Sequence, residues 1–214
     1  MDNLNRTLIG AALVGLLGAL FIFRNRDETV DPHSDPGAVK PLSQMEGVID
    51  HSRVTDDPVL SDLYVRAAKA LEKGDAKGAE RIYREAIAKY PNDPAGHSAL
   101  GTSLFFQNKL DPAIEAYEQA LKLDARSNSA LFGLGCVAYK QEHPVKAMAY
   151  LNRALAVDEG QGGTHRLMGL IYRNLGDRDQ AIRHFERAIE LASTLGSVDD
   201  VKSWLAELKQ ENEN

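Results

Sequence analysis

Hydrophobic and polar residues divide the chain into three parts. Residues 7–23 contain no charged side chain, residues 27–58 are polar and interrupted by prolines, and residues from 60 onward repeat a helical spacing of apolar positions. An uncharged run predicts a helix that is apolar on every face, prolines predict an extended linker, and a helical spacing predicts amphipathic helices. We therefore expect an all-α protein with one apolar helix close to residue 1.

A 34-residue period organises the third part. The blocks 60–93, 94–127, 128–161 and 162–195 align without a gap. The eighth, twentieth and twenty-seventh places of each block hold only alanine or glycine, and such a period is typical of stacked helical or β repeats. The twenty-fourth and twenty-eighth places hold large apolar residues: Tyr83, Tyr117, Leu151 and Phe185, and Ile87, Leu121, Leu155 and Ile189.

Each block predicts two helices joined by a short turn, at 74–75, 108–109, 142–143 and 176–177. Small residues at places eight and twenty allow the two helices to approach closely, and the large residue at place twenty-four fills the space beside them. A single hairpin cannot bury its apolar face, so we expect stacking of neighbours to supply the stability. In the second block, Asp111 and Pro112 are expected to be the N-cap and the first turn of the second helix.

These columns resemble the tetratricopeptide repeat (TPR) family, and residues 95–124 follow its pattern over nearly their whole length. The resemblance covers residues 60–195, although Pro91 is the only proline at the family's place near the end of a block. It implies a right-handed superhelical α-solenoid of four TPR helix hairpins. A last amphipathic helix within 196–214 is expected to cap the final repeat. Its apolar stripe is Val198, Val201, Leu205 and Leu208.

Residues 7–23 are interpreted as a transmembrane anchor. A helix of this length spans roughly 25 Å, against ~30 Å for the hydrocarbon core of a bilayer, and flanking arginines extend its reach. The run ends in Phe23 and Arg24 without the small-residue cleavage site of a signal peptide, so we expect it to be retained. The expected domains are an anchor at 1–26, a linker at 27–58, the repeats, and a capping segment.

The charges that flank the anchor favour one orientation. Arg24 and Arg26 follow the run, whereas Arg6 and the terminal amine precede it. The positive-inside bias favours a cytoplasmic repeat domain by one arginine, so the opposite orientation stays open. We expect a single-pass protein of a bacterial inner membrane.

Small residues lie four positions apart on one face of the anchor, at Ala11, Gly15 and Ala19. This spacing lets two helix backbones approach closely and predicts self-association through that face. The alternative is that alanine and glycine are simply common in membrane helices.

Charge and composition exclude several functions. The chain has 31 acidic and 25 basic residues, a net charge of −6, and no long basic stripe, which argues against a nucleic-acid partner. Cys136 is the single cysteine, so an intramolecular disulfide is excluded. The sequence has no phosphate-binding loop, no HExxH motif and no paired-cysteine metal site. We therefore expect a non-enzyme without a cofactor or a metal ion.

The TPR resemblance places the binding surface on the first helix of each hairpin. The chaperone-binding carboxylate clamp of the family needs lysine and asparagine at places five and nine, where the first block has Tyr64 and Ala68. The clamp is therefore absent, and an aromatic trough with a basic C-terminal end is implied. Such a trough suits a peptide with apolar anchors and an acidic group. The residues expected to form it are Tyr64, Phe105, Phe106, Phe132, Tyr139, Lys140, Arg166, Leu170 and Arg173.

The expected function is that of a membrane-anchored TPR scaffold that binds a partner protein or peptide and so assembles a membrane complex. The alternative is a self-assembling or stoichiometric structural subunit of a larger membrane complex. Two further interpretations of the trough stay open: its side chains pack between neighbouring helices, or residues 45–54 of the linker fill it.

Overall fold

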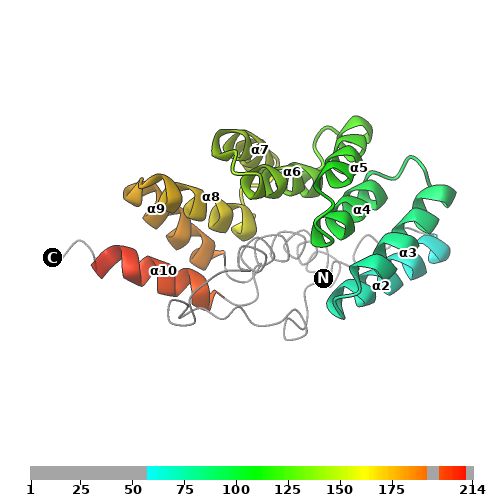
Figure 1. Ribbon diagram of the computed structural model, residues 1–214, viewed down its shortest axis with the longest axis horizontal. Helices are drawn as coiled ribbons and strands as arrows, with labels where there is room; N and C mark the ends of the chain where they lie inside the picture. Colours follow the sequence, from blue (N-terminus) through cyan, green and yellow to red (C-terminus); the bar gives the residue numbers. More distant parts are fainter. Residues whose placement is uncertain (1–56, 192–197, 211–214) are drawn as a thin grey trace, which may run out of the picture.

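The computed structural model describes residues 57–191 and 198–210, and all the regular structure in these ranges is helical (Figure 1). The predicted anchor, its small-residue stripe and residues 45–54 lie outside the described residues. Within the described ranges, no helix is long and apolar enough to cross a bilayer. The helices are α2 (Pro58–Glu72), α3 (Ala76–Lys89), α4 (Pro94–Phe106), α5 (Leu110–Leu123), α6 (Asn128–Lys140), α7 (Pro144–Val157), α8 (Gly162–Leu175), α9 (Arg178–Glu190) and α10 (Asp199–Gln210).

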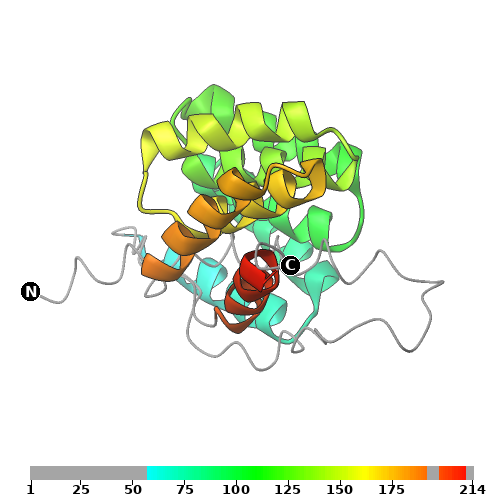
Figure 2. The same cartoon turned by 90° about the vertical axis from the view of Figure 1, so that its left-hand side faces the viewer.

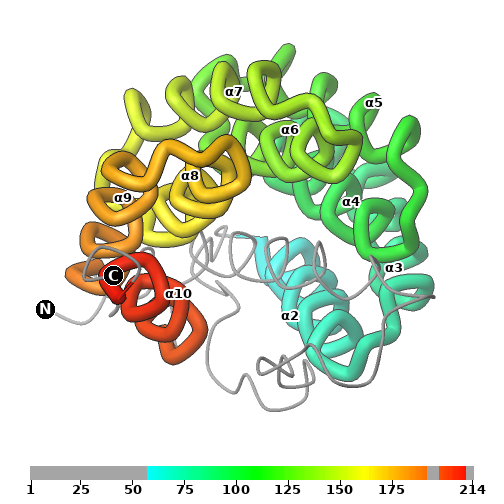
Figure 3. Tube along the Cα trace, turned by 60° about the vertical axis from the view of Figure 1, so that its left-hand side comes forward, coloured from blue at the N-terminus to red at the C-terminus, as the bar shows by residue number. Residues whose placement is uncertain are grey.

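The first eight of these helices form four hairpins that stack along a curve. Each hairpin packs on the next, with α3 against α4, α5 against α6 and α7 against α8, and α10 packs on α9. Figure 2 looks at the array from the end where α9 and α10 lie. In Figure 3 the first helix of each hairpin (α2, α4, α6 and α8) lies on the inner side of the curve, and the second helix lies on the outer side.

The turn inside each hairpin repeats every 34 residues. The residue at place fifteen of each block has a positive φ, between 60° and 77°, and it is glycine in two blocks, Asn108 in the second and Glu142 in the third. The next residue is the N-cap of the second helix in every block: Asp75, Lys109, His143 and Asp177. Asp75 and Asp177 accept a hydrogen bond from a backbone N–H of the first turn, which is the usual role of an aspartate at this position.

The expectation that Asp111 is the N-cap was therefore wrong by two positions, whereas Pro112 lies in the first turn as expected. Helix α5 begins at Leu110, with Lys109 as its N-cap, so both residues lie inside the first turn. The backbone of the preceding turn decides this, because the Lys109 N–H bonds the Leu104 carbonyl at 3.0 Å and closes α4. An aspartate in the first turn still interacts favourably with the helix dipole.

Proline begins a helix where the sequence interpretation placed the end of the linker. Pro58 is the first residue of α2, and the Asp57 carboxylate caps this helix by accepting from Val59 N–H at 2.8 Å. Proline is favoured at the first helical position because its missing N–H would have no partner there. Asp93 and Pro94 begin α4 in the same way.

Large side chains at place twenty-four fill the gaps that glycine leaves between helices. The Tyr117 ring of α5 lies so close to α4 that a Cβ added to Gly101 would be 2.7 Å from Cε1 of the ring. Leu151 lies in the same way against Gly135, and Phe185 against Gly169. The ring of Tyr117 also reaches the next hairpin, since a Cβ on Gly133 would be 2.3 Å from its Cζ. This second contact is between repeats and was not predicted.

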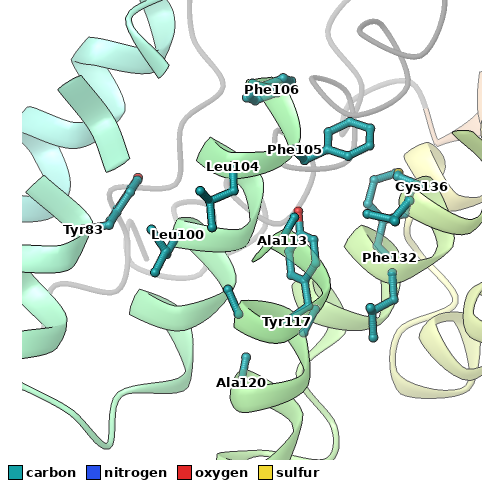
Figure 4. Close-up of a cluster of buried hydrophobic side chains, with 14 of the residues drawn as sticks. Tyr83, Leu100, Leu104, Phe105, Phe106, Ala113, Tyr117, Ala120, Phe132 and Cys136 are labelled. Carbon is teal, nitrogen blue, oxygen red and sulfur yellow. The ribbon is translucent and has the colours of Figure 1, made fainter. Parts of the chain in front are cut away.

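The buried apolar side chains form two clusters. The larger runs from α2 to α8, and Figure 4 shows part of it, including Tyr117 of α5 and Phe132 of α6. The smaller joins α8, α9 and α10 around Phe185 and Val201, neither of which is exposed. The predicted apolar stripe of the last helix is thus confirmed for Val198, Val201 and Leu208, which are buried, and it closes the C-terminal end of the array.

Candidate protein-binding surface

All nine residues expected to form the trough lie on the first helices of the hairpins, which line the inner side of the curve (Figure 3). They differ in how much of each side chain is accessible. Four are partly exposed: Tyr64, Tyr139, Lys140 and Arg173. Five are buried, with 8 % exposure or less: Phe105, Phe106, Phe132, Arg166 and Leu170.

The phenylalanines of the trough are part of the core. The rings of Phe105 and Phe106 lie 6.1 Å apart on α4, and Lys140 of α6 places its Nζ 5.6 Å from the Phe105 centroid. Phe132 of α6 is 2 % exposed and lies in the same cluster (Figure 4). Burial lowers the pKa of Lys140 below its ordinary value. All three aromatic side chains are therefore buried in the larger apolar cluster.

Two tyrosines join neighbouring inner helices through their hydroxyl groups. Tyr64 of α2 donates a hydrogen bond to the Asp93 carboxylate, the N-cap of α4. Tyr139 of α6 accepts a hydrogen bond of 2.8 Å from the side-chain amide of Asn174 on α8. A tyrosine presents an apolar ring beside a polar hydroxyl, a combination enriched at protein interfaces.

The basic end of the trough is joined to the last helix. Arg166 of α8 is 2 % exposed and forms an ion pair with Asp200 of α10. Burial lowers the pKa of Arg166, and the neighbouring Asp200 offsets part of this effect. The guanidinium carbons of Arg166 and Arg173 lie 5.5 and 5.3 Å from the ring centroid of Trp204. The last helix therefore contributes side chains to the inner surface.

The sequence interpretation did not assign Asp200 or Trp204 to the surface. A signal was nevertheless present for Asp200, which lies 34 residues after Arg166 and so occupies the same place in the period. Treating the last helix only as a cap hid this correspondence.

Reactive groups are few in the described part of the chain. It contains no group of three or more His, Cys, Asp or Glu side chains with metal-binding geometry. Burial raises the pKa of the Cys136 thiol far above neutral, so this cysteine stays protonated. The chemistry that the inner surface offers is therefore hydrogen bonding and charge, from its tyrosine hydroxyls and its lysine and arginine side chains.

A histidine pair joins α8 to α9 in the last hairpin. Nδ1 of His165 lies 3.0 Å from Nδ1 of His184, and Nε2 of His165 lies 3.3 Å from the Glu159 carbonyl oxygen. When both rings are neutral, His165 can donate its Nε2–H to that carbonyl and accept at Nδ1 from the Nδ1–H of His184. Burial lowers the pKa of both rings, and it is lowered to about 4 for His184, where His165 and Arg183 add to the effect; for His165, the Glu159 carbonyl opposes the shift and Arg187 adds to it.

This pair predicts a loss of stability in acid. The folded pKa of His184 is below its unfolded value, so the unfolded state binds more protons as the pH falls below about 6.5. We expect the free energy of unfolding to fall by about 1 kcal/mol between pH 7 and pH 5, allowing for the partial exposure of the rings. Urea denaturation of the wild type and of His184→Asn at pH 7 and at pH 5 measures this change in the free energy of unfolding. His184→Asn should lose part of this dependence, whereas the exposed His143→Asn should keep it, and equal dependence in all three proteins would refute the assignment.

The fold and the inner surface define a class, the TPR-type α-solenoid. Residues 63–192 match the family described as the cilia and flagella-associated protein 70 middle TPR-like domain, and the chain belongs to this family. The predicted TPR resemblance and the all-α solenoid are thus confirmed.

Curated relatives share the repeats over part of their length. The chain is 35 % identical over 105 residues to cellulose synthase operon protein C of Xanthomonas axonopodis pv. citri (strain 306), which covers 48 % of this chain and 7 % of that protein. It is 25 % identical over 134 residues to the mitochondrial import receptor subunit TOM70 of Rattus norvegicus, covering 62 % of this chain and 22 % of the relative. The chain therefore spans less than a quarter of either relative.

Solved structures show the same fold. PilF of Pseudomonas aeruginosa superposes with a TM-score of 0.63 at 22 % identity, over 72 % of this chain and 69 % of that chain. Yeast Tom70 gives a TM-score of 0.60 at 18 % identity, over 74 % of this chain and 34 % of that chain. A thermophilic TPR protein of Thermus thermophilus gives 0.62 at 20 % identity, over 71 % and 82 %.

Proposed function

We propose that the protein is a membrane-anchored TPR scaffold that binds a partner protein or peptide through its inner surface and so assembles a membrane-associated complex. The observation that carries the proposal is that three of the four inner helices, α2, α6 and α8, bear the partly exposed Tyr64, Tyr139, Lys140 and Arg173. Tyrosine and arginine are enriched at the centres of protein interfaces, whereas lysine is more common at their edges. The name of one relative, an import receptor subunit, agrees with binding of other proteins.

The structure changes which residues a partner would meet first. Four of the nine expected side chains are apolar and buried, so a partner would not contact them directly: Phe105, Phe106, Phe132 and Leu170. The two tyrosines and the two cations provide the contact area. This arrangement fits a partner that places apolar side chains beside Tyr64 and Tyr139. The same partner would place an acidic group beside Lys140 and Arg173.

The anchor and its consequences belong to the proposal. We assign residues 7–23 as the membrane-spanning segment of a bacterial inner-membrane protein, with 27–58 as the linker, 60–195 as a right-handed superhelix of four repeats on the cytoplasmic side, and 196–214 as the capping segment. Self-association through Ala11, Gly15 and Ala19 is part of the same assignment. The uncharged composition of the run supports the anchor.

The proposal is tested by affinity purification of the full chain from its native membrane. A partner recovered with the chain after detergent extraction, and lost when the inner surface is changed, is the expected result. Recovery of the chain alone, in cells that express it at its native level, would contradict the proposal.

The second candidate function is a stoichiometric structural subunit that makes contacts through the outer surface. The observation in its favour is Val145 on the outer helix α7, which is 84 % exposed, an unusual position for a large apolar side chain. The name of another relative, a BBSome complex member of Bos taurus, is compatible with it. Size measurement of residues 58–214, which lack the predicted anchor and its small-residue face, separates the scaffold from a self-assembling subunit, because a monomer disfavours self-assembly through the outer surface.

A further inference from the structure

Two arginines of α8 share one aromatic ring of α10. Arg166 and Arg173 are seven residues apart, which places them on one face of the helix two turns from each other. Their guanidinium carbons lie 5.5 and 5.3 Å from the centroid of the Trp204 ring. On its own side, Trp204 packs on Phe185 of α9 at 5.6 Å between centroids. The indole is therefore held between Phe185 of α9 and the two cations of α8.

The cations are incompletely paired. Arg166 donates through one Nη2–H to Asp200, but its Nε is buried and has no acceptor. Nη1 of Arg173 is also buried without an acceptor. Buried N–H donors normally have partners, so two such groups around one ring indicate an acceptor that binds there. For these two guanidinium groups, the described part of the chain supplies one carboxylate against two positive charges.

We propose that Arg166, Arg173 and Trp204 form a binding site for a carboxylate of the partner protein, with Asp200 as an intramolecular competitor. This inference rests on the proposed function and names the group that its basic end recognises. The ligand is an acidic side chain of the partner. This carboxylate accepts hydrogen bonds from Nε of Arg166 and Nη1 of Arg173, and the indole of Trp204 moves aside so that the carboxylate can reach them.

A single carboxylate fits this site better than other anions. Two arginines and one aspartate leave one positive charge uncompensated, which one carboxylate neutralises. A planar carboxylate can also accept two parallel hydrogen bonds from the fork of a guanidinium group. A nucleic acid would bring many phosphates to a chain whose net charge is −6. Trp204 is half-buried, so a modest displacement of the indole opens the guanidinium groups.

The chain carries its own reporter for this site, because Trp204 is its single tryptophan. The experiment titrates the full-length protein with the N-acetylated, C-amidated tripeptide Glu-Glu-Glu and follows tryptophan emission, with Gln-Gln-Gln blocked in the same way, at equal ionic strength, as the uncharged probe. We expect a saturable change with the first peptide and none with the second. Arg173→Gln should weaken the response about tenfold, the loss expected for a charged hydrogen bond.

Asp200→Asn distinguishes a ligand site from a purely structural contact. Asparagine can still accept the hydrogen bond from Arg166 but no longer carries the competing charge, so affinity for Glu-Glu-Glu should rise about three- to tenfold. A contact that only fastens α10 would give unchanged or weaker binding. The matched control is Arg153→Gln on the outer helix α7, where the arginine lies 5.9 Å from the Tyr150 centroid and binding should not change.

Three results would overturn the inference: an equal response to Gln-Gln-Gln, an undiminished response in Arg173→Gln, or unchanged or weaker binding in Asp200→Asn. Circular dichroism at the titration temperature confirms that each variant is folded. Capture of the native partner is measured separately. If substitutions on the inner surface abolish capture but Arg173→Gln does not reduce it, the proposed function stands and this site is wrong. If the tripeptide binds as expected but substitutions on the inner surface do not reduce capture, the proposed function fails.

Discussion

Replacing Tyr117 with alanine is expected to lower the free energy of unfolding by about 3–5 kcal/mol, the usual cost of removing a buried aromatic side chain. The ring is 2 % exposed and fills the space between α5 and two inner helices. Its hydroxyl lies 3.1 Å from Oγ1 of Thr102, which itself donates to the Ser98 carbonyl oxygen, so the tyrosine is the donor. Tyr117→Phe keeps the ring and should lose about 1 kcal/mol. Urea denaturation followed by circular dichroism measures both.

The contact between repeats makes a sharper test possible. Gly133→Ala places a Cβ 2.3 Å from the Tyr117 ring, so the helices must separate, and we expect a loss of about 1–3 kcal/mol or more. In the Tyr117→Ala background the obstacle is gone. The same substitution should then be neutral or stabilise α6 by up to about 1 kcal/mol, because alanine favours a helix over glycine. Equal costs in the two backgrounds would show that Tyr117 does not hold the hairpins together.

Replacing Phe185 with alanine is expected to make the C-terminal end of the array unfold at a lower urea concentration than the other hairpins. This ring is fully buried against Gly169 and Trp204, and it is central to the smaller apolar cluster. We expect a loss of about 3–5 kcal/mol in the stability of that cluster. Neighbouring repeats are coupled only through their shared interfaces, so the other hairpins should keep much of their stability.

Two probes detect this separation. Trp204 emission reports α10, whereas circular dichroism at 222 nm reports all the helices. In Phe185→Ala the emission transition should come at a lower urea concentration than the loss of helicity. The matched control is Phe185→Leu, because leucine fills the same place in the third hairpin at Leu151, and it should cost no more than about 1.5 kcal/mol. Coincident transitions in the alanine variant would contradict the division into two clusters.

The period of 34 residues predicted the helices, the turns and the contacts inside each hairpin. This worked because a glycine facing Tyr117, Leu151 or Phe185 is a local device, repeated at fixed places. Contacts between hairpins were harder to predict. The approach of Gly133 to the Tyr117 ring depends on the angle between successive hairpins, and no single column of the alignment encodes that angle.

For the expected trough, the sequence predicted which helices carry the nine residues but not which of their side chains are exposed, and binding of a partner there stays a prediction. All nine residues lie on inner helices, but a position on the inner face does not determine whether a side chain packs or is exposed. Phe132 is large enough to reach the core and is buried, whereas Tyr139 keeps its hydroxyl at the surface bonded to Asn174. The 34-residue spacing from Arg166 was a signal for Asp200, whereas the part played by Trp204 depends on the position of α10 against α8.

The central claim, that the inner surface binds the partner, is tested most directly by matched charge reversals. Lys140→Glu with Arg173→Glu changes two partly exposed cations on inner helices, and Lys146→Glu with Arg153→Glu changes two exposed cations on the outer helix α7. Both variants alter the net charge by the same amount, and both should fold. Capture of the partner from the native membrane, quantified against the wild type, should fall at least about tenfold for the inner variant and remain near the wild-type level for the outer variant. Full capture by the inner variant together with loss in the outer variant would contradict the account and place the partner on the convex side.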